Sequence, residues 1–285
     1  MDEIRINNLE IFANHGVFPE ENKLGQKFVV SCTLYLDTRK AGKGDRLEDS
    51  VHYGLIAQVI KKEMESHTFA LIECVAEHLA DIILDFDEKI REVEIEVKKP
   101  WAPVGLPLED VSVTIRRKWH EVYVAFGSNM GERDRYIEQG IEALKKQKDC
   151  RILKVSSVME TEPYGVKEQD KFLNGVLKME TKLMPYELLD VLHLIEAEAK
   201  RERKFHWGPR TLDLDILLYD DLIWQEDDLC IPHVDMQNRF FVLGPMAEIA
   251  PYKRHPVYGL TIKEMLEQLE KTEKQDSNLS DTGES

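Results

Sequence analysis

The sequence predicts two domains of the α+β class that meet near residue 119. Segments in which apolar and polar residues alternate are typical of half-buried strands. Other segments carry apolar residues at helical spacing, and a chain of 285 residues is long enough for two ordinary domains. We expect the domains to span residues 1–118 and 119–270, followed by a polar and disordered tail at 271–285.

The first domain is predicted to run strand, strand, helix, helix, strand, strand. Alternating residues mark strands around 4–11, 30–36, 93–97 and 111–115, and residues 100–107 are a proline-containing break. Helical spacing marks one helix up to about Ser66, capped by Asp49 or Ser50, and a second through residues 71–83. Antiparallel strands with two consecutive helices on one face form an α+β domain.

The second domain is also predicted to contain both strands and helices, but in a different order along the chain. A strand at 122–126 precedes a helix at about 132–147, and strands follow near 152–158 and 173–183. A helix from Pro185 to about Arg201 leads to a strand at 212–218, a hairpin around Asp220 and a late helix from about Thr261. These elements predict a second α+β domain.

The amino-acid composition argues against some classes of binding partner. A net charge of −16 argues against nucleic acid as a bulk partner, because a phosphate backbone would be repelled. No apolar run approaches about 20 residues, so no membrane span is expected. The cysteines are far apart in the sequence, which fits reduced thiols of a cytoplasmic protein better than disulfides or a zinc site: Cys32, Cys74, Cys150 and Cys230.

Two acids on one strand are the most informative feature. Asp213 and Asp215 alternate with apolar residues, so their carboxylates point to the same side, about 7 Å apart at about 3.3 Å per residue. Such a pair is more often simply a solvated face. With Arg210 just before it, however, the pair also suits a hard cation used in phosphate transfer.

Four blocks give the second half a resemblance to 6-hydroxymethyl-7,8-dihydropterin pyrophosphokinase over about residues 121–270. They are Ala125-Phe126-Gly127-Ser128-Asn129, Phe172-Leu173-Asn174, the run from Trp207 to Asp215, and Ile231-Pro232-His233-Val234-Asp235-Met236-Gln237-Asn238-Arg239. The resemblance implies a ferredoxin-like α/β sandwich. It also implies that a pyrophosphoryl group passes from Mg-ATP to the pterin hydroxymethyl group and that AMP is released.

The same resemblance implies the roles of individual residues. Asp213 and Asp215 would bind two Mg²⁺ ions that accompany ATP, and Arg201 and Arg210 would be catalytic. The residues implied to contact ATP are Arg201, Arg210, Glu196, Arg203, Trp207, Ile216, His233 and Arg239. Those implied to contact the pterin are Thr161, Pro163, Tyr164, Phe172, Asn174 and Phe241. For Arg203, charge complementarity at a helix end is an equally good explanation.

Five short blocks give the first half a resemblance to dihydroneopterin aldolase over about residues 1–117. They are His15-Gly16-Val17, Glu21-Asn22-Lys23-Leu24-Gly25-Gln26, Val51-His52-Tyr53-Gly54, Leu71-Ile72-Glu73 and Lys99-Pro100-Trp101-Ala102-Pro103. The resemblance implies a tunnelling fold, cleavage of 7,8-dihydroneopterin to glycolaldehyde and 6-hydroxymethyl-7,8-dihydropterin, and no cofactor. It further implies a homo-oligomer, a tetramer or an octamer, with sites between neighbouring subunits.

In this resemblance Glu73 pairs with the amino-pyrimidine edge of the pterin, and Lys99 transfers a proton. Tyr53 and Glu21 match catalytic residues at the substrate side chain, and Val51, His52 and Ile72 match substrate-binding residues. Lys98 would face the opposite side of the strand, and Lys99 is preferred because it directly precedes the proline block. Glu73 could instead serve only the dipole of its helix.

The pairing of the two halves predicts a bifunctional enzyme of folate biosynthesis acting on small molecules, because the product of one half is the acceptor of the other. Two alternatives remain open for the first half. It could be a non-catalytic oligomerisation module, or it could act on pterins as an epimerase. A metal aldolase is not expected, since His15 and His52 lack a third ligand at suitable spacing.

Overall fold

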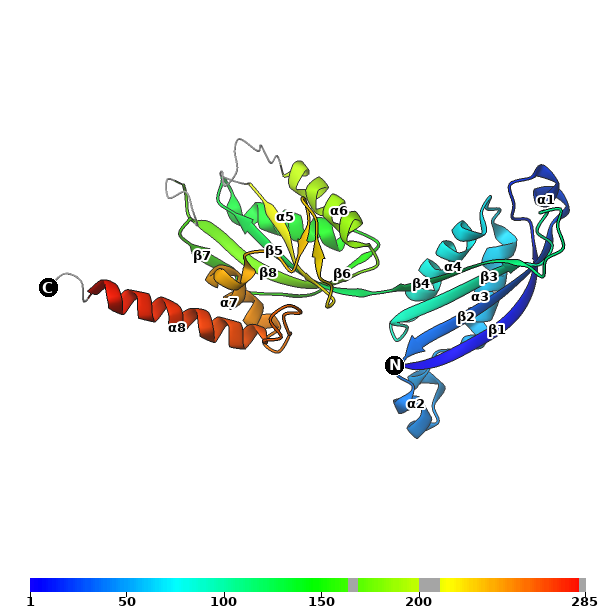
Figure 1. Cartoon of the computed structure of the whole chain (residues 1–285), viewed down its shortest axis with the longest axis horizontal. Helices are drawn as coiled ribbons and strands as arrows, with labels where there is room; N and C mark the ends of the chain where they lie inside the picture. The colour runs from blue at the N-terminus through cyan, green and yellow to red at the C-terminus, as the bar shows by residue number, and fades with distance from the viewer. Residues whose placement is uncertain (164–168, 200–210, 282–285) are drawn as a thin grey trace. The chain divides into compact units, whose positions relative to one another are not determined.

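The computed structural model describes residues 1–163, 169–199 and 211–281 (Figure 1). Contacts divide the chain into two units, Met1–Trp119 and His120–Ser285. The division falls one residue after the expected position because Trp119 packs in the first unit. Its side chain is 5% exposed, and its indole Nε1 donates a hydrogen bond to the Leu84 carbonyl oxygen at 3.4 Å.

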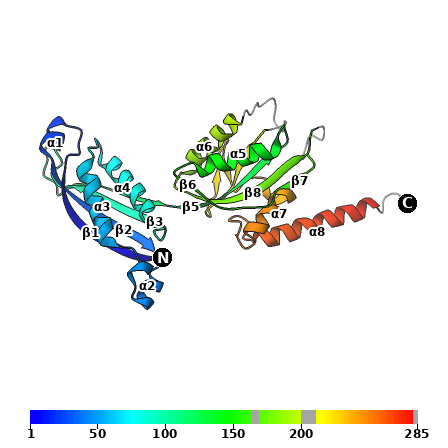
Figure 2. The ribbon, with the colours of Figure 1, turned by 180° about the vertical axis from the view of Figure 1, so that it is seen from behind.

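The first unit has one antiparallel sheet in the order β1-β2-β3-β4, with helices α3 and α4 packed against it (Figure 2). The predicted order of two strands, two helices and two strands is confirmed. The principal elements are β1 (Asp2–Ala13), β2 (Gln26–Leu36), α3 (Tyr53–Ser66), α4 (Ile72–Phe86), β3 (Glu92–Lys99) and β4 (Val111–Lys118). Shorter elements lie between them: α1 (Pro19–Leu24), α2 (Arg39–Gly44) and the 3₁₀ helix η1 (Leu47–Asp49).

A β-bulge explains why the apolar alternation of the first strand changes phase. The register between β1 and β2 shifts between Ile6 and Leu9. Asn8 has φ 54°, and its backbone N–H donates to Ser31 Oγ at 3.3 Å. The extra residue lets apolar side chains on both sides of the bulge face the same core.

The start of α3 corrects one prediction. The N-cap is His52, whose Nδ1 accepts a hydrogen bond from the Leu55 amide at 3.3 Å, and neither Asp49 nor Ser50 takes this role. Asp49 lies in η1 instead, where its buried carboxylate forms ion pairs with Lys40 and Arg46.

The second unit has a central sheet in the order β6-β8-β5-β9, with β7 paired to β8 and every pairing antiparallel. One helix connects β5 to β6 and another connects β8 to β9, which is the ferredoxin-like order. The elements are β5 (His120–Ser128), α5 (Arg133–Lys145), β6 (Cys150–Val155), β7 (Met159–Thr161), β8 (Phe172–Thr181), α6 (Pro185–Glu198) and β9 (Asp213–Tyr219). A second pair of strands, β10 (Trp224–Gln225) and β11 (Cys230–Ile231), and the 3₁₀ helix η2 (Met236–Asn238) follow.

Helices cover both faces of this sheet (Figures 1 and 2). Side chains on one face pack with α5 and α6, and those on the other pack with α7 (Phe240–Ile249) and α8 (Ile262–Asp281). The sequence did not predict α7, because its residues are apolar apart from Glu248 and include Pro245. The tail expected to be disordered from residue 271 continues as helix through Asp281.

Within the described residues, no helix is both long enough and apolar enough to cross a lipid bilayer.

Candidate active sites

Lys99, the last residue of β3, forms an ion pair with Glu21 of α1. The distance from Nζ to Glu21 Oε1 is 2.5 Å, and the two side chains are 11% and 10% exposed. Lys98 is 30% exposed and pairs with Glu96 at 3.4 Å instead. Strand alternation therefore brings Lys99, and not Lys98, to the buried carboxylate.

Two further donors fix the Glu21 carboxylate. The Phe18 amide donates to Oε2 at 3.1 Å, and Gln26 Nε2 donates to Oε1 at 2.9 Å. Burial raises the pKa of Glu21, but the hydrogen bonds from Lys99, Phe18 and Gln26 outweigh it and hold the pKa below its ordinary value. Glu21 is consequently ionised near neutral pH.

Gly16 makes room for this carboxylate. Its φ is +151°, and a Cβ added there would lie 2.3 Å from Glu21 Oε2. Any other residue would push the acid away from its donors. The position needs glycine for both its backbone conformation and its close approach.

Two buried polar atoms close to this pair lack a hydrogen-bond partner among the described residues. They are Nε2 of His15, whose side chain is 1% exposed, and Oε1 of Gln26. Burial lowers the pKa of His15 to about 4, assisted by the positive charge of Lys99, so the imidazole is neutral. Unpartnered buried polar atoms beside an ion pair are typical of a site that receives a polar ligand. Gln26 was not predicted as a site residue, because only its burial and its contact with Glu21 mark it as one.

Tyr53 and Glu73 lie at the starts of the two helices and are exposed, Tyr53 to 62%. Within the described part of the chain, neither side chain hydrogen bonds to Glu21 or Lys99. The first-turn position of Glu73 also remains compatible with a role in stabilising the helix dipole.

The other predicted pterin neighbours of the first unit differ in exposure. Val51 is 1% exposed and packs in the core, so only its backbone can meet a ligand. Ile72 is partly buried against the same core, and His52 is exposed at the cap of α3.

In the second unit, strand register places the predicted metal and pterin residues on one face of the sheet. Asp213 of β9 is opposite Gly127 of β5, and Gly127 is opposite Asn174 of β8. Paired residues in a sheet share a face, and Asp215 lies on that face two residues further along β9. Both acids are partly exposed.

Gly127 leaves open space in the row that it forms with Asp213 and Asn174 across the three strands. A Cβ added to it would lie 2.8 Å from Asn174 Oδ1. The opposite end of the Asn174 amide, Nδ2, donates to Thr161 Oγ1 at 2.8 Å. Thr161 itself pairs with Phe172 in the β7–β8 ladder. Three of the predicted pterin residues are therefore neighbours.

Glu196 of α6 supports the strand that carries the acids. Its side chain is 2% exposed, and Oε1 accepts the backbone N–H of Leu214 at 2.8 Å. Leu214 lies between Asp213 and Asp215, so this bond holds the edge strand from the helix side. In this chain Glu196 has a positioning contact that its predicted role in ATP binding did not anticipate.

His233 lies close to Asp213, and Arg239 lies close to His233. The His233 amide donates to the Leu217 carbonyl of β9 at 3.0 Å. Burial lowers the pKa of His233 to about 4, with a further contribution from Arg239 and opposition from Asp235 and Asp213. Arg239 pairs with Asp235 at 3.3 Å.

The remaining predicted residues fall into three groups. The guanidinium of Arg239 lies 5.8 Å from the ring centroid of Phe241, which is partly buried, as is Pro163. Ile216 is 4% exposed in the core beside α5 and α6, so only its backbone could meet a nucleotide. The other predicted positions lie outside the described residues: Tyr164, Arg201, Arg203, Trp207 and Arg210.

The donor set on β9 suits magnesium. Carboxylate oxygens are the ligands that this hard cation takes from proteins, and it binds through one or two of them together with substrate phosphates. Two acids on one face of a partly exposed strand meet that requirement without forming a closed cage.

Two family models match the chain, namely dihydroneopterin aldolase over residues 4–116 and 7,8-dihydro-6-hydroxymethylpterin-pyrophosphokinase over residues 123–251. The folic acid synthesis protein FOL1 of Dictyostelium discoideum is 34% identical, and the match covers 93% of this chain and 44% of that protein. The 2-amino-4-hydroxy-6-hydroxymethyldihydropteridine pyrophosphokinase of Bacillus subtilis is 44% identical, and that match covers 45% of this chain and 76% of the enzyme.

A solved structure of E. coli dihydroneopterin aldolase in complex with neopterin is 33% identical. The match covers 41% of this chain and 99% of that one, with a TM-score of 0.39. The chain spans less than half the length of the Dictyostelium protein, so the relative carries additional sequence.

Proposed function

The chain belongs to the dihydroneopterin aldolase family in its first half and to the 7,8-dihydro-6-hydroxymethylpterin-pyrophosphokinase family in its second, and we propose that it catalyses two successive steps of folate biosynthesis. The first step cleaves 7,8-dihydroneopterin to glycolaldehyde and 6-hydroxymethyl-7,8-dihydropterin. The second transfers a pyrophosphoryl group from ATP to the new hydroxymethyl group and releases AMP.

For the aldolase step, we assign proton transfer to the Glu21–Lys99 pair. A retro-aldol reaction removes a proton from a side-chain hydroxyl and needs a sink for the electrons left on carbon. The ring imine of the dihydropterin is that sink, so no Schiff base with the protein is required. The buried pair can accept and return protons in a site screened from water.

Glu73 and Tyr53 complete this proposal. A carboxylate at Glu73 can form two parallel hydrogen bonds with the amino-pyrimidine edge, and Tyr53 can contact the hydroxylated side chain. Both are exposed in a single chain, and neither hydrogen bonds to Glu21 or Lys99 within the described residues. Glu73 follows Phe69, whose carbonyl oxygen accepts the Gly16 amide at 2.9 Å, so it lies at the Glu21 end of the same chain. Tyr53 lies at the opposite end of α3, and we propose that it meets this pair from a neighbouring subunit.

Exposed apolar side chains support a homo-oligomer. Large hydrophobic residues around α1 and at the start of α4 are 52% to 72% exposed: Phe12, Val17, Phe18, Leu24 and Leu71. Apolar side chains gathered near a polar site are typical of surfaces that another chain covers. We propose a tetramer or an octamer built from the first unit.

For the kinase step, Asp213 and Asp215 would hold two Mg²⁺ ions with the phosphates of ATP. The bound ions would neutralise charge on the phosphates. The pterin hydroxyl attacks the β-phosphorus, and AMP is the leaving group. Asn174 and Thr161 are suited to hydrogen bonding the pterin, and Phe172 and Phe241 to stacking on its ring.

Arginines and His233 supply the remaining contacts of this proposal. His233 lies near Asp213 and Arg239 lies near His233, and we propose that both contact phosphate oxygens. Arg201 and Arg210 are proposed as catalytic cations and Arg203 and Trp207 as ATP contacts, with Pro163 and Tyr164 beside the pterin. We place the enzyme in the cytoplasm, where ATP is abundant and its free cysteines stay reduced.

The observation that most supports this function is the row formed by Asp213, Gly127 and Asn174, which sets the proposed metal ligand and the proposed pterin ligand on one face. The test is to supply dihydroneopterin and Mg-ATP and to assay glycolaldehyde and AMP together. EDTA should abolish AMP formation and leave glycolaldehyde release within about twofold, since only phosphate transfer uses a Lewis acid. Loss of both products on chelation would contradict the proposed aldolase mechanism.

A further inference from the structure

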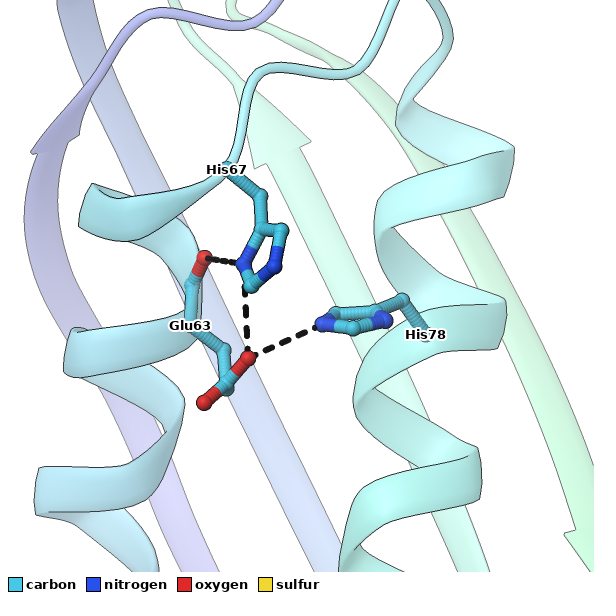
Figure 3. Close-up of side chains that lie close together, drawn as sticks. All are labelled: Glu63, His67 and His78. Carbon is cyan, nitrogen blue, oxygen red and sulfur yellow. Dashed lines mark hydrogen bonds and ion pairs between the residues drawn. The ribbon is translucent and has the colours of Figure 1, made fainter.

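Three side chains with metal-binding chemistry meet between α3 and α4, as Figure 3 shows. Glu63 lies in the last turn of α3, His67 follows the end of that helix, and His78 lies on α4. His78 Nε2 is 3.1 Å from Glu63 Oε2, and His67 Nδ1 is 3.4 Å from the same oxygen. One ligand atom from each residue lies within 4.8 Å of the other two.

These separations match a tetrahedral metal site. Zinc binds imidazole nitrogen and carboxylate oxygen at about 2.0–2.2 Å, which places neighbouring ligand atoms of a tetrahedron roughly 3.3 Å apart. The two separations that involve Glu63 lie on either side of this value. The third lies within reach of a side-chain rotation of His67, whose side chain is 48% exposed.

Neighbouring side chains fix the two imidazoles and the Glu63 carboxylate while leaving them accessible to solvent. The ring of Phe69 stacks on His67, with centroids 5.8 Å apart and planes at 18°, and contacts His78 at 5.1 Å. Glu63 is 15% exposed and His78 is 28% exposed. One side of the cluster is thus an apolar wall, and the other is open for an ion to enter and for water to take a fourth position.

We propose that Glu63, His67 and His78 bind a divalent transition-metal ion, with Zn²⁺ as the preferred occupant. Two imidazoles and one carboxylate favour such an ion over Mg²⁺, which prefers an octahedral shell of oxygen ligands. The ion ties the end of α3 to α4. It has no part in either reaction proposed above, because the ligands are separate from both the Glu21–Lys99 pair and the acids of β9.

The site also lies next to the interior of the aldolase unit. Phe69 contacts the ring of His15 at 5.6 Å, and the Phe69 amide donates to His15 Nδ1 at 3.2 Å. His15 precedes Gly16, which accommodates the Glu21 carboxylate. An ion that fixes Phe69 through His67 and His78 therefore stabilises the segment that leads to this carboxylate.

Hydrogen bonds between the imidazoles and Glu63 could produce similar distances without a metal, and zinc titration separates the two cases. In equilibrium dialysis of the full chain against Zn²⁺, excess Mg²⁺ competes for the acids of β9. Wild type should retain one Zn²⁺ per chain, and its thermal midpoint should rise with added Zn²⁺. His67→Gln and His78→Gln should each weaken binding by at least about tenfold.

His193→Gln is the matched control, because it removes an exposed imidazole of α6 that is outside the cluster. His78→Cys should restore the binding lost in His78→Gln, since a thiolate can replace imidazole as a zinc ligand but does not reproduce its hydrogen bond. Substituting Co²⁺ should give the intense visible absorption of tetrahedral coordination. A wild-type chain that holds no Zn²⁺ in excess Mg²⁺, or glutamine variants that bind as wild type does, would overturn the proposal.

Discussion

Glu21 and Lys99 form an ion pair in which Oε1 and Nζ are 2.5 Å apart and both side chains are about nine-tenths buried. The carboxylate comes from a short helix after β1, and the amine comes from the last residue of β3. Each charge compensates for the burial of the other. Removing one partner from such a pair leaves an uncompensated charge, which commonly destabilises a protein by about 3–5 kcal/mol.

Neutralising either member of this pair should stop the aldolase step. We expect Glu21→Gln and Lys99→Met to slow glycolaldehyde release by at least about 100-fold, the scale of lost acid–base catalysis. AMP formation from added 6-hydroxymethyl-7,8-dihydropterin should stay within about twofold of wild type, which shows that the second unit is intact. Circular dichroism and the retained oligomer size show that the first unit is folded. Lys98→Met is the control, and a loss as large as that of Lys99→Met would contradict the assignment.

Shared sites between subunits can be tested by mixing inactive variants. Lys99→Met and Tyr53→Ala oligomers should each release little glycolaldehyde. When the two chains are co-expressed, hybrid oligomers should regain activity, because some interfaces then combine an intact Lys99 with an intact Tyr53. Mixed oligomers that stay as inactive as the separate variants would show that one chain provides both residues.

The space above Gly127 should govern pterin binding. In Gly127→Ala, the new methyl group would collide with Asn174 Oδ1, which it would approach to 2.8 Å. We expect the KM for the pterin to rise about tenfold or more while the KM for ATP changes little, since small displacements of positioning groups are costly. Gly42→Ala, where a Cβ meets nothing within 4 Å, should leave both constants unchanged.

Acid should destabilise the first unit through His15. Its pKa in the folded chain is about 4, whereas an unfolded histidine titrates near 6.5. The unfolded state therefore binds more protons between these values, and the stability present above about pH 6.5 declines as the pH falls towards about 4. The loss can reach about 3 kcal/mol.

Hydrogen exchange of amides in residues 1–119, corrected for intrinsic rates, measures this change. His15→Gln should be less stable at neutral pH and should lose less of its stability on acidification. An equally steep decline in the variant would assign the effect to other groups.

Most strands and helices could be predicted from the sequence, because the alternation of apolar residues in strands and their spacing in helices follow directly from which side chains are buried. In β2, Val30, Cys32 and Leu34 alternate with half-buried residues as expected. The prediction failed where local signals are weak: α7 has no polar face, and His52 caps α3 although histidine is an unusual N-cap.

The candidate sites were harder to predict than the strands. Resemblance identified Glu21 and Lys99 one by one, but their pairing depends on the contact between α1 and the end of β3, which no local pattern encodes. Burial also explains why Ile216 and Glu196 differ from their predicted roles as ATP contacts. Ile216 faces the core, and Glu196 hydrogen bonds to the backbone of β9.

The most direct test of the two-reaction account uses Asp213→Asn, Asp215→Asn and the double variant with dihydroneopterin and Mg-ATP. Wild type should produce glycolaldehyde, followed by AMP and pyrophosphorylated pterin. Each variant should release glycolaldehyde at the wild-type rate and lose AMP formation by at least about 100-fold, with 6-hydroxymethyl-7,8-dihydropterin accumulating. Wild-type rates of AMP formation in the double variant would contradict the account.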